Sequence, residues 1–254
     1  MTTARPHDRA PTTRADRHDP AMPGDAVARI VVVVPVRNEG RLLPECLAAL
    51  ARAAARVDVR VRIQLVLDAC TDESEQVPPP EVEVMRVEER NVGAARARGF
   101  LHAGAACGAE TWFATTDADS QVDELWLRRQ LDYARAGSDV VAGIVEVRDW
   151  APHTPATRRR YEDEYRTSGP HGHIHGANLG FRADAYWRVD GFQQLRTGED
   201  VDLVTRMVAD GARIAWAEDV RVITSARRVG RAPQGFAAHL RRIESSPSTQ
   251  RRSA

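Results

Sequence analysis

The sequence predicts an α/β fold built on a mostly parallel central sheet flanked by helices. Strand-like and helix-like segments alternate along the first half of the chain, which is the pattern of βαβ units. The first strand-like run, Arg29–Pro35, is rich in valine and shows no alternation of polar and apolar residues, as expected for a strand buried on both faces. Polar residues follow several of these runs, at the sheet edge where open α/β folds bind ligands.

The remaining elements of the first half follow from the same criteria. The later strands are expected at Val61–Leu67, Val82–Val87, Thr111–Thr116 and from Asp139 to about Val147. The helices are expected at Leu42–Ala55, in an alanine-rich segment that ends near Cys107, and at Val122–Ala136. Apolar residues of Leu42–Ala55 recur at helical spacing, so this helix has one stripe to bury against the sheet.

The pattern changes after Val147, where a long charged segment begins. Such a segment inside a compact domain is usually functional or mobile. The elements expected beyond it are a helix around Thr157–Thr167, a helix from Gly198 to about Ala209, strands at Arg213–Ala217 and Val220–Thr224, and an amphipathic segment at Gly235–Ile243.

The composition predicts a single globular domain at residues 27–244, between disordered tails at 1–26 and 245–254. The 36 basic and 36 acidic residues cancel, which argues against broad affinity for nucleic acid or anionic membranes. The three cysteines form no C-x-x-C pair, so free thiols in a reducing cytoplasm are expected. No apolar run is long enough to span a bilayer, and no transmembrane segment is expected.

Two carboxylates, Asp117 and Asp119, directly follow the strand expected at Thr111–Thr116. Spaced by one residue, they point into the same turn at the carboxyl edge of the sheet. Two close carboxylates repel each other unless a cation neutralises them, and Mg²⁺ or Mn²⁺ suits such oxygen ligands. The alternative is structural: Asp117 starts a turn, and Asp119 or Ser120 caps the helix at Val122–Ala136.

Five motifs, in this order, resemble those of inverting, metal-dependent family-2 glycosyltransferases with the GT-A fold, whose sheet is Rossmann-like. They are Val34-Pro35-Val36-Arg37-Asn38-Glu39, Asp68-Ala69-Cys70-Thr71-Asp72, Asn91-Val92-Gly93-Ala94-Ala95-Arg96, Thr116-Asp117-Ala118-Asp119 and Gly198-Glu199-Asp200. The resemblance covers roughly Arg29 to Thr224. It implies a nucleotide-binding half at residues 27–120 and an acceptor-binding half at 121–244.

The resemblance also implies a role for each motif residue. The nucleotide pocket would be lined by Pro35, Val36, Glu39, Asp68, which would bond the base, and Arg96, with Arg98 as second choice. Asp117 and Ala118 would contact the ribose or sugar, and Asp119 would ligate Mn²⁺ or Mg²⁺, with Asp117 as a second metal ligand. Asp200, paired with Glu199, would be the catalytic base, and Gly176, Ala177 and Asn178 would form the wall around the transferred sugar.

Structural alternatives stand beside several of these roles. Asp68 and Asp72 are also typical of an Asx turn, and Glu199 and Asp200 are typical first-turn acids of a helix. Arg96 and Arg98 suit solvated helix charges equally well. The histidines His171, His173 and His175 suit an acceptor loop or plain surface better than zinc, and Trp150 is a candidate to stack on a sugar.

The chain also departs from the family pattern. Leu67 stands where the second motif usually has a further Asp, and Ala97 follows Arg96 where the family usually has Asn. No Q-x-x-R-W follows Asp200, which argues against processive synthesis. No His lies between His175 and His239, so the metal shell would be completed by a folded-back His239 or by Thr224, Ser225 and water. Arg227 and Arg228 could instead clamp the diphosphate.

Together these observations predict a non-processive inverting glycosyltransferase that moves a sugar from a nucleotide donor, UDP- or GDP-linked, to an unknown acceptor hydroxyl. The alternatives are a sugar nucleotidyltransferase of related fold and a non-catalytic nucleotide-sugar-binding protein. The first would need a glycine-rich basic loop after the first strand, and Arg37-Asn38-Glu39-Gly40 is a poor version of it.

Overall fold

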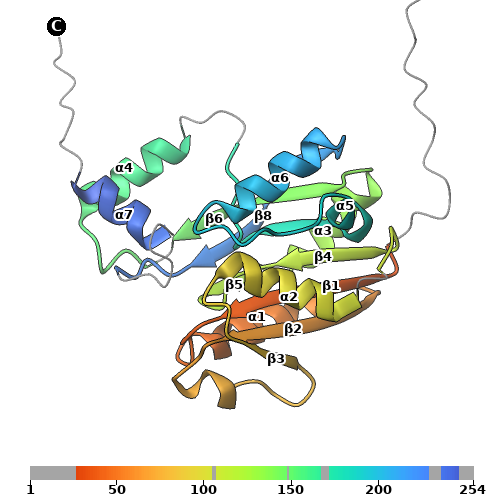
Figure 1. Ribbon diagram of the computed structural model, residues 1–254. Helices are drawn as coiled ribbons and strands as arrows, with labels where there is room; N and C mark the ends of the chain where they lie inside the picture. Colours follow the sequence, from red (N-terminus) through yellow and green to blue (C-terminus); the bar gives the residue numbers. More distant parts are fainter. Residues whose placement is uncertain (1–26, 105–106, 148, 167–171, 229–235, 246–254) are drawn as a thin grey trace, which may run out of the picture.

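A computed structural model describes residues 27–104, 107–147, 149–166, 172–228 and 236–245 (Figure 1). One eight-stranded sheet runs through the described part of the chain in the order β3-β2-β1-β4-β7-β6-β8-β5. The strands are β1 (Arg29–Val36), β2 (Arg60–Asp68), β3 (Glu83–Val87), β4 (Thr111–Thr115), β5 (Ser120–Val122), β6 (Val140–Val147), β7 (Leu179–Arg182) and β8 (Ile214–Thr224). The helices are α1 (Leu43–Ala54), α2 (Val92–Gly104), α3 (Trp126–Arg135), α4 (Pro155–Arg166), α5 (Ala183–Arg188), α6 (Glu199–Ala209) and α7 (Phe236–Ser245), with a 3₁₀ turn at Glu73–Gln76.

Strand β1 lies inside the sheet and is buried on both faces, as its valine run predicts. Ile30 and Val32 pack into the core under α1 and α3, whereas Val31 and Val33 pack into the core under α2, α5 and α6. Parallel pairing with β2 and β4 aligns the carboxyl ends of the three strands. The polar loops that follow these strands therefore meet at one edge of the sheet.

The predicted α/β fold with a mostly parallel sheet is confirmed, although the described sheet is mixed. Strands β3, β2, β1 and β4 are all parallel, and β6 pairs in parallel with β8. Strand β7 is antiparallel to both β4 and β6 and joins the two parallel groups (Figure 1). Strand β7 is not predicted from the sequence, because its four residues are too few to show a strand period.

Three other features of the fold differ from the sequence predictions. The helix expected from Val122 begins only at Trp126, because Ser120–Val122 forms β5, which pairs with β8. The two strands expected at Arg213–Ala217 and Val220–Thr224 are one strand, β8, with a bulge opposite Gly143 and Ile144. The six-residue helix α5 was not predicted.

Helices α4 and α7 pack against each other beside the end of β6 (Figure 1). Tyr161 of α4 and Leu240 and Ile243 of α7 form a small cluster with Ala226, which follows β8. Residues distant in sequence thereby close one side of the sheet edge. Among the described residues, no helix has the length and apolar character needed to cross a bilayer.

Asn178 precedes β7 and is fully buried. Its side-chain amide donates to the carbonyls of Ile144 (2.8 Å) and Val220 (2.9 Å). Its Oδ1 accepts from the indole of Trp126 at 2.8 Å. Because Ile144 lies on β6 and Val220 on β8, this amide holds the bulge between the two strands and ties it to α3.

Replacing Asn178 with alanine should lower the free energy of unfolding by about 3 kcal/mol, about 1 kcal/mol for each of the three hydrogen bonds lost. Urea denaturation followed by circular dichroism would measure the loss. Gln121→Ala is the control, since Gln121 makes one exposed hydrogen bond to Glu45. The control should change stability by less than about 0.5 kcal/mol. Equal effects of the two substitutions would contradict the assignment.

Candidate active site

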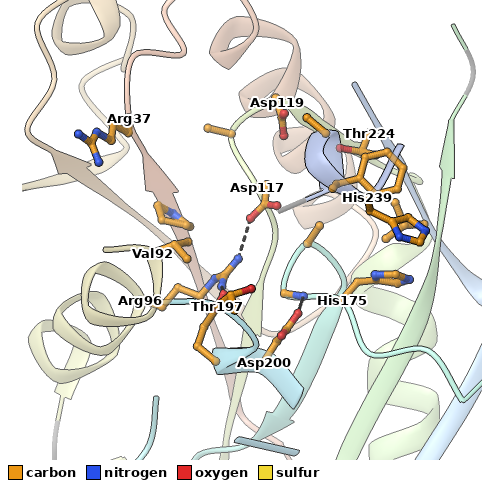
Figure 2. A pocket seen from close by; sticks show the side chains of 18 of the residues that line it. Arg37, Val92, Arg96, Asp117, Asp119, His175, Thr197, Asp200, Thr224 and His239 are labelled. Atoms are coloured by element: carbon orange, nitrogen blue, oxygen red, sulfur yellow. Dashed lines mark hydrogen bonds and ion pairs between the residues drawn. The ribbon is translucent and has the colours of Figure 1, made fainter. Parts of the chain in front are cut away.

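A cavity of about 980 Å³ lies at the carboxyl ends of β1, β2 and β4. The loop before β7, the first turn of α6, the end of β8 and helix α7 complete its walls. The site residues predicted from the sequence that line it are Pro35, Val36, Glu39, Asp68, Arg96, Asp117, Ala118, Asp119, Gly176, Ala177, Glu199, Asp200 and Arg227. Figure 2 shows Arg37 at one end, His175 and His239 at the other, and Asp117 and Asp200 between them.

Asn178 is the one predicted nucleotide-sugar residue that does not line this cavity. Its amide is committed to Trp126, Ile144 and Val220, as described above. The prediction that Asn178 forms part of a wall around the sugar is therefore corrected to a structural role. Its neighbours Gly176 and Ala177 remain in the cavity wall.

Arg96 joins the separate loops of the site. Its side chain is 2% exposed, and it pairs with Asp117 at 2.7 Å and with Glu199 at 2.6 Å (Figure 2). Burial by itself would lower the pKa of Arg96, but the charges of the two acids raise it, so the guanidinium stays protonated. The interpretation of Arg96 as a solvated helix charge is therefore wrong. Arg98, in contrast, is a solvated helix charge, because it is half-exposed and pairs with Glu89.

The guanidinium of Arg96 leaves no room for a side chain at position 176. A Cβ on Gly176 would lie 2.6 Å from Nη2 of Arg96. The ring of Phe192 packs on the other side, with its centroid 5.5 Å from the guanidinium carbon. Arg96 thus fixes the acidic turn after β4, the first turn of α6 and the loop before β7 relative to one another.

A second arginine, Arg227, bridges two other carboxylates. It bonds Glu39 at 2.6 Å and Asp119 at 3.1 Å. Glu39 comes from the loop after β1 and is 7% exposed, so its charge needs a partner. Arg227 therefore ties the segment after β8 to the loop after β1 and to the acidic turn.

Burial raises the pKa of Asp119 to about 7. The charge of Arg227 opposes this rise, whereas the charges of Asp117 and Glu39 add to it. Because the folded state holds this proton more tightly than the unfolded state, the associated stability is present below about pH 4 and is lost as the pH rises through about 7. Above about pH 7, Asp119 is ionised, and the charge of Arg227 only partly offsets the cost of burying that carboxylate.

The chemistry of Asp117 and Asp119 fits a divalent cation. Among the described residues, no group of three or more His, Cys, Asp or Glu side chains is arranged to hold a metal ion. The protein would thus supply one or two carboxylates and leave the other positions to phosphate and water, as is usual for Mg²⁺. A bound cation would neutralise the crowded charge that raises the pKa of Asp119.

Asp200 lies at the start of α6, on the cavity side (Figure 2). Its Oδ2 accepts from the backbone N–H of Gly176 at 2.6 Å, and its Oδ1 accepts from that of Val201 at 2.9 Å. Burial raises its pKa, the charge of Glu199 adds to the rise, and Arg96 opposes it. Glu199 itself is buried against Arg96, so of the two acids Asp200 is the one placed to accept a proton.

The two acids of the second motif have structural partners. Asp68 accepts from the backbone N–H groups of Arg90 (2.7 Å) and Asn91 (3.0 Å) and so shapes the turn into α2, while it also lines the cavity. Asp72 caps the 3₁₀ turn by accepting from Ser74 and also bonds the backbone of Gly40. The turn interpretation thus holds for Asp72, and Asp68 combines a turn with a cavity position.

Two of the three histidines line the cavity, and the described residues contain no group of three or more His, Cys, Asp or Glu side chains that could hold a metal ion. His173 and His175 line the cavity, with parallel rings whose centroids lie 5.9 Å apart, and His171 lies outside the described residues. Helix α7 brings His239 back to the cavity, as one of the sequence alternatives expected, together with Thr224 and Ser225 at the end of β8.

Two other candidates lie away from the cavity. Trp150 packs against Tyr161 and His153 and does not line the cavity, so its predicted role in stacking on a sugar is not supported. Arg228 bonds Pro152 and Glu244 and does not line the cavity. Of the two arginines considered for that role, only Arg227 lines the cavity.

Several cavity residues were not singled out from the sequence. Among them are Arg90, Arg196, Tyr161, Phe236 and Arg242. Tyr161, Phe236 and Arg242 lie on α4 and α7, whose sequences show helical amphipathicity and no motif. No local signal could have placed them beside the acidic turn, because the packing of α4 on α7 does so.

The mixed sheet, with acidic loops gathered at the ends of its parallel strands, is the fold of the GT-A class. Residues 31–190, more than half of the chain, match the model of glycosyl transferase family 2. The chain therefore belongs to glycosyl transferase family 2, and the resemblance identified from its motifs is confirmed. A comparison with curated proteins gave no match.

Solved structures share the fold at low sequence identity. The structure of S. aureus TarS 1-349 in complex with UDP-GlcNAc has a TM-score of 0.61 and 14% identity over 85% of this chain. The mannosyltransferase PcManGT from Pyrobaculum calidifontis, in complex with GDP-Man and Mn²⁺, has a TM-score of 0.60 and 19% identity over 80% of this chain. This chain covers 65% and 58% of those two chains, less than two thirds of each.

Replacing Arg96 with methionine should destabilise the fold by about 3–5 kcal/mol, because Glu199 would remain buried without its partner. Arg98→Met is the matched control on the same helix, and its exposed pair should contribute less than about 1 kcal/mol. The free energy of unfolding in urea would separate the two. A loss in Arg96→Met no larger than in the control would show that Arg96 does not join the loops.

Proposed function

We propose that this chain is an inverting glycosyltransferase that transfers a sugar from a nucleoside diphosphate to an acceptor hydroxyl. The observation that carries the proposal is that two separate sets of carboxylates line one cavity. The acidic turn, Asp117 and Asp119, and the separate carboxylate Asp200 face the same space and are joined through Arg96 and Glu199. A site with one carboxylate pair for the donor and another carboxylate for the acceptor suits sugar transfer.

In the proposed reaction, the bond between the anomeric carbon and the diphosphate oxygen breaks as a bond to the acceptor oxygen forms. The acceptor hydroxyl gives its proton to Asp200, and the nucleoside diphosphate leaves with its negative charge. The anomeric centre passes through an oxocarbenium-like state. Attack by the acceptor from the face opposite the leaving group inverts the configuration, which a single base on that side supports.

The surroundings of Asp200 suit a base. The backbone N–H groups of Gly176 and Val201 fix the carboxylate, so its orientation is set before the acceptor arrives. Its raised pKa makes it a stronger base than an ordinary aspartate. Glu199 takes a positioning role, because its carboxylate is paired with Arg96.

The donor diphosphate would lie beside the acidic turn and Arg227, and its oxygens would replace one of the contacts that Arg227 makes with Glu39 and Asp119. A Mn²⁺ or Mg²⁺ ion on Asp119, when bound, would stabilise the charge of the leaving diphosphate as a Lewis acid. Arg227 can offer bidentate hydrogen bonds to phosphate oxygens. Pro35, Val36 and Asp68 lie at the same end of the cavity as Arg37 and would hold the nucleoside. A UDP- or GDP-sugar is the expected donor, as in the complexes of the two structural neighbours.

The donor site can be tested by thermal melting with UDP, GDP, CDP, dTDP and ADP, each with and without Mn²⁺. UDP or GDP with Mn²⁺ should raise the melting temperature, since a ligand at a hundredfold excess over Kd stabilises by about 2.7 kcal/mol. Asp119→Asn should abolish the metal-dependent part. Asp132→Asn, a control on the exposed face of α3, should retain it. No shift with any of the nucleotides would refute the donor site.

Replacing Asp200 with asparagine should lower the turnover number by about 10²–10⁴-fold while the nucleotide-induced melting shift remains. Release of nucleoside diphosphate from the donor, with water as a slow acceptor, would measure turnover. Asp202→Asn, two residues further along α6 and paired with Arg206, is the control and should stay active. Because the pKa of Asp200 is raised, the wild-type rate should fall with decreasing pH at a value above 3.8. Full activity of Asp200→Asn would exclude it as the base.

A further inference from the structure

The end of the cavity opposite Arg37 differs in chemistry from the rest of the site (Figure 2). Chain position and contacts with His175 and His239 group these described lining residues here: Val145, Tyr161, His173, Ile174, His175, Phe236, Ala237, His239 and Arg242. Among these described residues there is no carboxylate, and the polar groups are imidazoles, one phenol and one guanidinium. The carboxylates of the cavity lie instead at its centre and at its nucleotide end.

The contact between His239 and Arg242 defines what this end can offer a ligand. Nη2 of Arg242 lies 2.8 Å from Nδ1 of His239. A guanidinium can only donate hydrogen bonds, so Nδ1 of His239 is the acceptor in this contact. The imidazole then carries its proton on Nε2, which is a donor. The pair therefore presents donors and positive charge.

Aromatic rings hold this pair in place. The ring of Tyr161 lies 6.3 Å from that of His239 and 5.7 Å from that of Phe236. Tyr161 is buried, and it anchors α4 against α7 in the small cluster with Leu240. The donors thus stand on a packed pair of helices, which favours a preformed binding surface.

The same end is joined to the proposed base. His175 precedes Gly176, whose backbone N–H donates to Asp200 at 2.6 Å. A group bound beside His175 and His239 would therefore belong to the molecule whose hydroxyl faces Asp200. The donor nucleotide would lie toward Arg37, at the other end.

We propose that the acceptor carries an anionic group, a phosphate or a carboxylate, and that Arg242 and His239 bind it. The inference rests on the proposed function, because it concerns the acceptor of that reaction. A neutral polyol needs acceptors as well as donors from its site, whereas an oxyanion only accepts. A wall of donors with a guanidinium matches an oxyanion best, through charge-assisted hydrogen bonds.

The test uses the full chain and three small probes at constant ionic strength: glycerol, glycerate and glycerol 3-phosphate. Thermal melting should show stabilisation by glycerate or glycerol 3-phosphate and none by glycerol. Comparing the two anions distinguishes a carboxylate acceptor from a phosphate acceptor. Stabilisation by neither anion, or by glycerol to the same extent, would overturn the inference.

Two adjacent arginines of α7 provide the variants. In Arg242→Gln the affinity for the anionic probe should fall by about tenfold or more, the loss expected for a charge-assisted hydrogen bond. Arg241→Gln should bind as the wild type, since Arg241 bonds the carbonyl of Arg228 and does not line the cavity. Both residues are exposed, so the melting temperatures without probe should agree. Equal binding by Arg242→Gln and Arg241→Gln would contradict the assignment.

The melting shift with UDP or GDP and Mn²⁺, measured on the same variants, separates the two proposals. If the nucleotide stabilises the protein and the anions do not, the anionic acceptor is wrong and the transferase proposal stands. If neither nucleotide stabilises the protein but an anion does, the transferase proposal fails, and with it the assignment of the anion as an acceptor. The nucleotide shift should be the same in Arg242→Gln as in the wild type.

Discussion

The buried guanidinium of Arg96 is the interaction on which the rest of the site depends. It holds Asp117 of the acidic turn and Glu199 at the start of α6, and it packs against Gly176. Asp117 follows β4 and Gly176 precedes β7, which pair in the sheet, whereas Glu199 begins α6 outside the sheet. A buried charge with two acidic partners fixes their relative positions, because loss of either partner would leave a charge uncompensated in a medium of low dielectric constant.

The carboxylates around the acidic turn are crowded and buried. Arg227 bridges Glu39 and Asp119, and burial together with the charges of Asp117 and Glu39 still raises the pKa of Asp119 to about 7. A divalent cation that arrives with a diphosphate, as we propose, would offset the charge of these carboxylates. The described residues around His239 and Arg242 instead carry imidazoles and a guanidinium. In the proposed reaction, Asp200 therefore lies between the donor and the acceptor.

The mixed sheet explains how one cavity acquires both ends. The parallel group β3-β2-β1-β4 places its loops at the end of the cavity near Arg37, and the antiparallel strand β7 connects it to the group of β6 and β8. Helices α4 and α7 then close the side near His239 against the end of β6 and the residues after β8. Asn178 maintains this arrangement from the core, where it bonds β6, β8 and α3.

The sequence by itself determined the α/β class, most of the strands and helices, the acidic turn and the order of the family motifs. These features are recorded locally, in hydrophobic periodicity and in the residues that follow each strand. Only the tertiary structure decided that Arg96 is buried and Arg98 exposed, that Asn178 is structural, and that Arg227 reaches Glu39. The last two residues are 188 positions apart, and no local pattern reports such a contact. Packing of the whole chain sets it, through burial and charge pairing that depend on every element between them.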